Sequence, residues 1–254
     1  WPLANKAETE RRCLAQIDAL VCLGSAALKL LSTTPPASPW SSWAIVFALG
    51  CVEGRQAVAC VHEHVAQLRA DQRLHRRRAA EAFAASHNPH YVPLARACMA
   101  TPGCEPFALE LASLRQQLQP ADVQGWLQRP EPEIQAVALR AWSRLAQPPA
   151  DVRPIETLLD TADPDLAWQA CRALTFWSSG APLSALRHGG TLLSLLGERA
   201  IELVVLCGHH DDAQLVQRLV RRLEPTPALL DAVARLGHPG TWAFLAHYLG
   251  DPVL

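Results

Sequence analysis

The stretch that most resembles a chemical site is "LCGHHDDAQL", residues 206–215. It places one cysteine, two histidines and two aspartates in six consecutive positions, and thiolates, imidazoles and carboxylates are the side chains that bind zinc. Adjacent residues of a turn seldom converge on one ion without ligands from elsewhere in the chain. The residue types alone therefore leave two interpretations, a metal site or a turn between helices.

Related segments elsewhere in the chain favour the turn. "GHHDD" (208–212) aligns with "GHPGT" (237–241) at an offset of 29, and "SHNPH" (86–90) has a histidine in the corresponding place. A short polar segment that recurs between apolar helical stretches is typical of a connection between repeats. We therefore interpret the opening stretch as one of three related turns.

This interpretation assigns a structural role to most residues of the turn. We expect Gly208 and Gly237 to end a helix in the left-handed conformation, which is least costly for glycine. Asp212 and Thr241 are expected to cap the following helix with a side-chain oxygen. The residues that keep a metal-binding alternative are His209, His210 and Asp211.

Two further segments carry histidine or arginine at suggestive spacing. In "CVHEHV" (60–65), His62 and His64 are two residues apart, so a helix turns them about 200° away from each other. We expect one solvated and one partly packed histidine. "RLHRRR" (73–78) is a basic run without the interleaved aromatic residues of nucleic-acid readers, and we expect a solvated helix face.

The chain contains no motif for catalysis or for phosphate binding. GxSxG and glycine-rich phosphate loops are both missing from the sequence. The net charge of −1 gives no support for binding to nucleic acid or to an anionic membrane, which both favour a basic surplus. We therefore predict a protein that is not an enzyme, without cofactor or metal, and with another protein as its partner.

Cysteine usage and hydropathy predict a cytoplasmic protein. The eight cysteines form no CxxC pair and mostly lie in apolar helical stretches, which is typical of free thiols in a reducing compartment. The longest apolar run, residues 43–52, is far shorter than the roughly 20 residues that span a bilayer.

Apolar residues recur at spacings of three and four nearly throughout, which predicts an all-α protein. We expect a long helix over residues 7–32, a proline-rich linker over 33–40, and helices at 43–52 and 55–70. Residues 1–74 would form a cap for the remainder of the chain, because an end repeat without a cap leaves its apolar face open.

The remainder, residues 75–254, is repetitive. "EIQAVALRAWSRLA" (133–146) matches "DLAWQACRALTFWS" (165–178) at an offset of 32, and each segment follows a proline that starts a helix. Helices paired at a period of about 30 residues indicate an α-solenoid, here with about five pairs. Since the chain stops where a new helix would begin, we expect the native protein to continue past Leu254.

The two aligned segments also resemble a known family. "DPDLAWQACRAL" (163–174) and "EPEIQAVALRAW" (131–142) resemble the "D-P-x-x-R/W-x-x-A-x-x-A-L" phrase of HEAT-like helical repeats. The resemblance implies a solenoid of paired antiparallel helices. The overall layout is also similar to uncharacterised proteobacterial HEAT-like proteins that are encoded near type VI secretion genes.

The resemblance further implies a binding surface. We expect Leu166, Ala170, Leu174 and Trp177 to face inward. Trp168, Arg172 and Thr175 would then lie on another side of their helix, beside Arg140 of the preceding repeat. In HEAT-like solenoids the second helix of each pair lines the concave face, so this row resembles a partner-binding strip. Tryptophan and arginine dominate binding hot spots. The alternative is that Trp168 packs against the neighbouring repeat.

The function predicted from these features is that of a non-catalytic protein-binding module. The resemblance to proteins of type VI secretion loci favours an immunity protein that binds and neutralises a secreted toxin. The alternatives are an effector adaptor or chaperone, or a general scaffold. A second alternative is a HEAT-like enzyme similar to a DNA glycosylase or a bilin lyase, which would require a basic channel around a catalytic acid.

Overall fold

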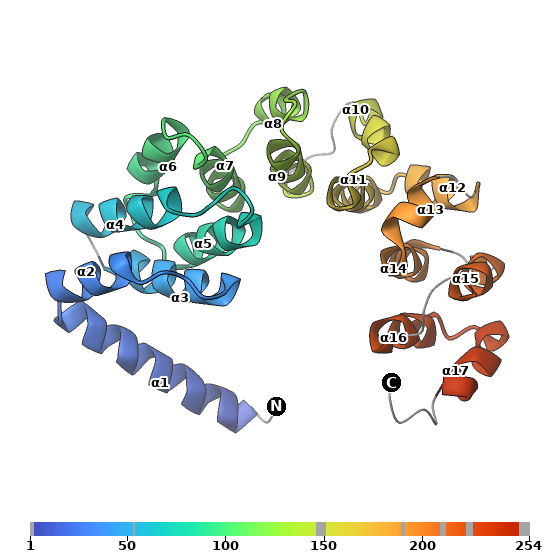
Figure 1. The fold of residues 1–254 in the computed structure, drawn as a ribbon, viewed down its shortest axis with the longest axis horizontal. Helices are drawn as coiled ribbons and strands as arrows, with labels where there is room; N and C mark the ends of the chain where they lie inside the picture. The colour runs from blue at the N-terminus through green and yellow to red at the C-terminus, as the bar shows by residue number, and fades with distance from the viewer. Residues whose placement is uncertain are drawn as a thin grey trace. The chain divides into compact units, whose positions relative to one another are not determined.

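The computed structural model describes residues 3–52, 54–145, 151–188, 191–208, 212–221 and 226–248. Every regular element in these ranges is helical, which confirms the prediction of an all-α protein. The α-helices labelled in Figure 1 are Leu3–Cys22 (α1), Ser25–Thr33 (α2), Pro39–Gly50 (α3), Arg55–Ala66 (α4), Arg73–Ala85 (α5), Tyr91–Met99 (α6), Glu105–Leu114 (α7), Pro120–Leu127 (α8), Pro132–Trp142 (α9), Arg153–Glu156 (α10), Pro164–Phe176 (α11), Ala181–Arg187 (α12), Thr191–Leu196 (α13), Glu198–Cys207 (α14), Ala213–Val220 (α15), Pro227–Leu236 (α16) and Trp242–Tyr248 (α17). Short 3₁₀ helices are Thr157–Asp160 (η1) and Pro239–Thr241 (η3).

The chain divides into two compact units, Trp1–Asp122 (unit 1) and Val123–Leu254 (unit 2). The predicted limit between capping helices and repeats, after residue 74, falls inside unit 1, where α5 packs against both α3 and α7. The assignment of residues 1–74 to a cap and of 75–254 to about five repeats stays a prediction.

The helices α2 to α7 of unit 1 form two rows. In one row α2, α4 and α6 contact one another in succession, and in the other row α3, α5 and α7 do so. The core between them includes the fully buried rings of Phe83 and Phe107. Ala79, Ala80 and Ala82 of α5 are also fully buried, and such small side chains allow neighbouring helix axes to approach closely.

The proline-rich linker is shorter than expected, because α3 begins at Pro39. Ser38 is the N-cap, and its Oγ accepts a hydrogen bond from the backbone N–H of Ser41 at 3.1 Å. The Ser41 Oγ accepts in return from the backbone N–H of Ser38 at 2.8 Å. This capping box, with proline in the first turn, satisfies two backbone donors and starts the helix four residues before the predicted position.

The helix predicted over residues 7–32 is wrong as a single element. It ends at Cys22, and a second helix starts at Ser25 after Gly24, which has a φ of 55°. Glycine adopts this left-handed geometry at little cost, so it breaks a helix whose apolar spacing continues on both sides. No described helix is by itself long and apolar enough to cross a membrane. The segments Glu10–Leu20 and Ser25–Thr33 together have the length and composition of a span, but they are bent by 109°.

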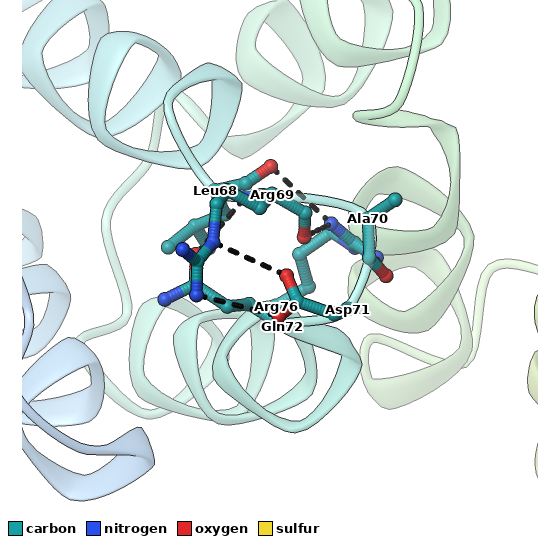
Figure 2. A network of polar contacts seen from close by, with 6 residues as sticks. All are labelled: Leu68, Arg69, Ala70, Asp71, Gln72 and Arg76. Carbon is teal, nitrogen blue, oxygen red and sulfur yellow. Dashed lines mark hydrogen bonds and ion pairs between the residues drawn. The ribbon is translucent and has the colours of Figure 1, made fainter.

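The basic run 73–78 contains a buried structural residue, Arg76, shown in Figure 2. Its Nη1 donates to the carbonyl oxygens of Arg69 and Leu68 at 2.8 and 3.4 Å, and its Nη2 donates to that of Ala70 at 3.0 Å. These carbonyls belong to the loop that follows α4. Figure 2 shows the guanidinium of Arg76 lying across this loop, so the arginine holds the α4–α5 connection in place.

The expectation of a solvated face for this run is therefore wrong. Besides Arg76, its members Arg77 and Arg78 are half-buried and both pair with Glu81 at 3.0 and 2.5 Å. Arg78 also lies 4.3 Å from the ring centroid of Trp40, in the geometry of a cation–π contact. Three of the cations are thus engaged within unit 1, and only Arg73 and Leu74 at the start of the run are exposed.

The two histidines of α4 lie on different faces, as their spacing predicts. His64 is fully buried, and its Nε2 lies 3.4 Å from the Oγ of Ser42. Burial, together with the nearby His75, lowers the pKa of His64 to about 4. His62 is half-buried, and its Nε2 lies 2.9 Å from the Oγ of Thr101. Both rings are therefore more enclosed than the expected solvated and partly packed pair.

Unit 2 also has two rows of helices, which can be followed in Figure 1. In one row α9, α11, α14 and α16 contact one another in succession. The other row holds α10 with η1, then α12 and α13, then α15, and finally η3 with α17. These helices contact the first row, for example η1 on α11 and α12 on α14.

The register predicted for the two aligned helices is confirmed by their burial. Ile134, Ala138 and Trp142 of α9 are buried, as are the residues 32 positions later, Leu166, Ala170 and Leu174 of α11. The fourth predicted pair, Leu145 and Trp177, lies just past the ends of the two helices and is half-buried. Pro132 and Pro164 occupy the first turn of each helix. At α11 the carboxylate of Asp163 caps the backbone N–H groups of Asp165 and Leu166 at 2.9 and 3.1 Å.

All eight cysteines are free thiols in the structure. Cys98, Cys104 and Cys171 are buried, while Cys13 and Cys22 of α1 are exposed. Burial raises the pKa of both Cys98 and Cys171 to about 12. The expectation that cysteines serve mainly as small core residues therefore holds for the central helices and not for α1.

Candidate protein-binding surface

One side of α11 is buried and the other side is accessible. Six residues of the helix are buried, and the helical period places all of them on one side: Leu166, Ala167, Ala170, Cys171, Ala173 and Leu174. The accessible side contains Trp168, Arg172 and Thr175, spaced four and then three residues apart. Arg172 is exposed, and the other two are half-buried. The predicted residues of this helix therefore share one face, and solvent reaches that face.

Arg140 lies on the equivalent side of α9. It is half-buried and follows the buried Ala138 and Leu139. The indole Nε1 of Trp177 donates to the carbonyl oxygen of Trp142 at 3.2 Å, so the C-terminal ends of α9 and α11 lie together. Arg140 and Arg172 both precede these ends by less than two turns, which places them toward the same edge of the row. We call Arg140, Trp168, Arg172 and Thr175 the α9–α11 strip.

The strip is not a set of isolated charges. Arg140 and Arg172 both interact with other groups of the protein. A guanidinium has five N–H donors, so an internal contact leaves capacity for a second acceptor. Trp168 is half-buried, so the residue is both partly packed against the protein and partly accessible to a partner. An arginine and tryptophan held in place in this way suit a binding site, because little side-chain entropy is lost on association.

Phe176 extends the strip and was missed from the sequence. It lies four residues after Arg172 and is 60% exposed, one of the most exposed large apolar side chains among the described residues. Its ring contacts that of Trp177 edge to face, with centroids 5.1 Å apart and an interplanar angle of 87°. Its spacing from Arg172 could have predicted this position, because residues four apart on a helix share a face.

The next helix of the row adds charged groups to the same side of unit 2. On α14 the exposed residues are Arg199 and Glu202, while Ile201 and Leu203 are buried. Arg199 Nη1 lies 2.7 Å from the Oδ1 of Asp165, which links α14 to the first turn of α11. No repeat phrase marks α14 in the sequence, and this contact could not be placed from spacing alone.

The turn at 208–212 supports a structural role at its two ends. Gly208 ends α14, but with a φ of −78° it is not left-handed as expected. Glycine is needed there for a different reason, since a Cβ would lie 2.4 Å from the carbonyl oxygen of Val204. Gly237, at the end of α16, does adopt the left-handed conformation, with a φ of 63°.

The capping roles predicted for this pair of turns are wrong. Asp212 occupies the N-cap position of α15, yet its carboxylate does not cap the helix. It is buried and accepts two hydrogen bonds from Arg187, each at 2.7 Å. In the second turn the Oγ1 of Thr241 donates to the carbonyl oxygen of His238 at 2.7 Å, and His238 Nδ1 accepts from the backbone N–H of Gly240.

The metal-binding alternative concerned His209, His210 and Asp211, which lie outside the described residues. Within the ranges that the structure describes, no group of three or more histidine, cysteine, aspartate or glutamate side chains is arranged to hold a metal ion. Comparison with models of known protein families, with characterised proteins and with solved structures gives no match. The surface chemistry of unit 2 is therefore the basis for a functional proposal.

Proposed function

We propose that the protein is a non-catalytic, cytoplasmic protein-binding module built as a HEAT-like solenoid, and that the α9–α11 strip contacts its partner. The observation that carries the proposal is the composition of the accessible side of α9 and α11. Tryptophan, arginine and phenylalanine are concentrated there, and these residue types contribute most to the binding energy of protein interfaces.

Several features of the fold support the solenoid. In unit 1 the helices α2, α4 and α6 contact one another in succession, as do α3, α5 and α7, and in unit 2 the helices α9, α11, α14 and α16 do so. The 32-residue offset between α9 and α11 preserves the buried positions, as expected for stacked repeats. An extended row of helices offers a long, continuous surface to a partner. The resemblance to proteins of type VI secretion loci makes a secreted toxin the partner class that we propose.

The experiment is a pull-down with the tagged protein from its native cell, followed by mass spectrometry. We compare the wild type with Trp168→Ala, Arg172→Ala and Phe176→Ala. Arg218→Ala is the matched control, because Arg218 is exposed on α15 outside the strip. A specific partner should be recovered with the wild type and the control, and at least tenfold less with each strip variant, which corresponds to about 1.4 kcal/mol.

Recovery of the same partner with all three strip variants at the wild-type level would remove the strip from the proposal. The toxin-neutralising role is tested separately, by expressing the recovered partner alone and together with this protein. Growth arrest that the wild type relieves and Arg172→Ala does not relieve supports that role. A partner without toxicity favours an adaptor or scaffold instead.

A further inference from the structure

A groove lies between α4 and α6 of unit 1, far in sequence from the strip. It has a volume of about 460 Å³, which is within the range of small-molecule sites. Four residues form its apolar wall: Val58 and Ala59 of α4, and Pro93 and Ala97 of α6. Three polar residues complete the lining, namely Arg55, His62 and His90.

Among the described residues that line the groove, the polar side chains are cationic or neutral and none is a carboxylate. Arg55 stands at the first position of α4 and is exposed. Among the residues that the structure describes, neither the Arg55 guanidinium nor the His90 imidazole has a hydrogen-bond or ion-pair partner. In unit 1 this contrasts with Arg76, Arg77 and Arg78, which are engaged by carbonyls or by Glu81. The charge of the groove therefore favours an anionic occupant.

The orientation of His62 is fixed by a hydrogen-bond relay. The hydroxyl of Thr101 has one proton, which it donates to the carbonyl oxygen of Ala97 at 2.9 Å. The Thr101 Oγ1 must then accept the hydrogen bond that joins it to His62 Nε2 at 2.9 Å. His62 Nε2 thus carries a proton, and the ring is held as one polar wall of the groove.

The length of the groove limits the size of its occupant. Arg55 and His62 are seven residues apart on α4, about two turns or roughly 10 Å. An extended peptide of about three residues already spans that distance, and a folded segment of a partner protein is longer than this. The groove therefore accommodates a compact molecule better than a folded segment. The apolar wall would contact the body of such a molecule, and Arg55 would lie at one end of it.

We infer that this groove binds a small organic carboxylate, with an apolar body against Val58, Ala59, Pro93 and Ala97 and with the carboxylate on Arg55. Charge-assisted hydrogen bonds between a guanidinium and a carboxylate are the strongest polar contacts available to these residues. The site lies in unit 1 and is independent of the protein-binding strip, so either proposal can fail without the other.

The test is isothermal titration calorimetry of the full chain with three probes: octanoate, its uncharged isostere octanamide, and acetate. Octanoate should bind saturably, octanamide about tenfold more weakly, and acetate too weakly to measure. The difference between octanoate and octanamide measures the contribution of the carboxylate, and a tenfold difference corresponds to about 1.4 kcal/mol. The difference between octanoate and acetate measures the contribution of the apolar body.

Two variants and a control locate the site. Arg55→Gln should weaken octanoate about tenfold and leave octanamide unchanged, whereas Ala59→Leu should abolish binding of both by filling the groove. Ala59 is exposed, so its replacement by leucine leaves the core intact, which a thermal melt checks. Arg96→Gln is the matched control on α6, since Arg96 is exposed and outside the groove.

The inference is overturned by any of three results. Octanoate fails to saturate, octanamide binds as tightly as octanoate, or Arg55→Gln weakens octanoate no more than Arg96→Gln does.

Discussion

Lowering the pH should destabilise unit 1 through one residue, His64. The imidazole is fully buried between α4 and α3, and burial lowers its pKa from an ordinary value of 6.5 to about 4. In the unfolded chain the ring takes up a proton as the pH falls through 6.5, whereas the folded protein keeps it neutral until about pH 4. Folding therefore becomes less favourable over this window.

The magnitude follows from the two pKa values. At pH 5 the unfolded ring is almost fully protonated and the folded ring is mostly neutral, so the free energy of unfolding decreases by about 2 kcal/mol relative to pH 7.5. Below pH 4 the decrease in the free energy of unfolding levels off at about 3.4 kcal/mol, which corresponds to the whole difference between the unfolded pKa of 6.5 and the folded pKa of about 4. Stability above pH 6.5 owes nothing to this effect.

The assay is urea unfolding followed by far-UV circular dichroism at pH 7.5 and at pH 5. The variant is Ser42→Ala with His64→Leu, which removes the ring without leaving the buried Ser42 hydroxyl unpaired. It should lose about 2 kcal/mol less than the wild type between the two pH values. His247→Gln, at an exposed position of unit 2, should behave as the wild type. An equal pH dependence in wild type and double variant would refute the reasoning.

Three further outcomes are expected. Arg76→Met should lower the free energy of unfolding by about 3 kcal/mol in urea titrations, because three loop carbonyls lose a charged donor. Gly208→Ala should lower the melting temperature, since its Cβ would meet a backbone carbonyl at 2.4 Å, while Gly180→Ala, with open space around it, should keep or slightly raise it. In the native protein the thiol reagent DTNB should label the two exposed cysteines of α1 within minutes and leave Cys98 and Cys171 unlabelled until denaturant is added, as their burial and raised pKa predict.

The helices α9 and α11 could be predicted from sequence because several independent signals coincide there. In α9 and α11, a proline at the first turn, an acidic residue beside it and apolar spacing all indicate the same start and the same buried face. Burial of Ile134 and Leu166 at equivalent positions follows directly from that agreement. The accessible side with Trp168 and Arg172 is then what remains of the surface of α11.

The errors arise where one residue has two competing roles. Gly24 is tolerated inside a helix or breaks it, and apolar spacing on both sides gave no reason to expect the break. Asp212 lies at a helix start, a position that predicts a cap, but its carboxylate instead accepts hydrogen bonds from Arg187, 25 residues away in the sequence. Arg76 belongs to a basic run that predicts a solvated helix face. The preceding loop, however, presents carbonyl oxygens to which the buried guanidinium donates hydrogen bonds. Such choices depend on tertiary contacts.

The carboxylate of Asp212 has a consequence for how unit 2 unfolds. A side chain that capped its own helix would stabilise α15 alone, and the helix could fray without affecting its neighbours. Bonded to Arg187 at the end of α12, the carboxylate instead makes the order of α15 depend on the preceding helices. Contacts of this kind between neighbouring helices make their unfolding cooperative. Removing α12 should therefore destabilise α15, and the two helices should unfold together.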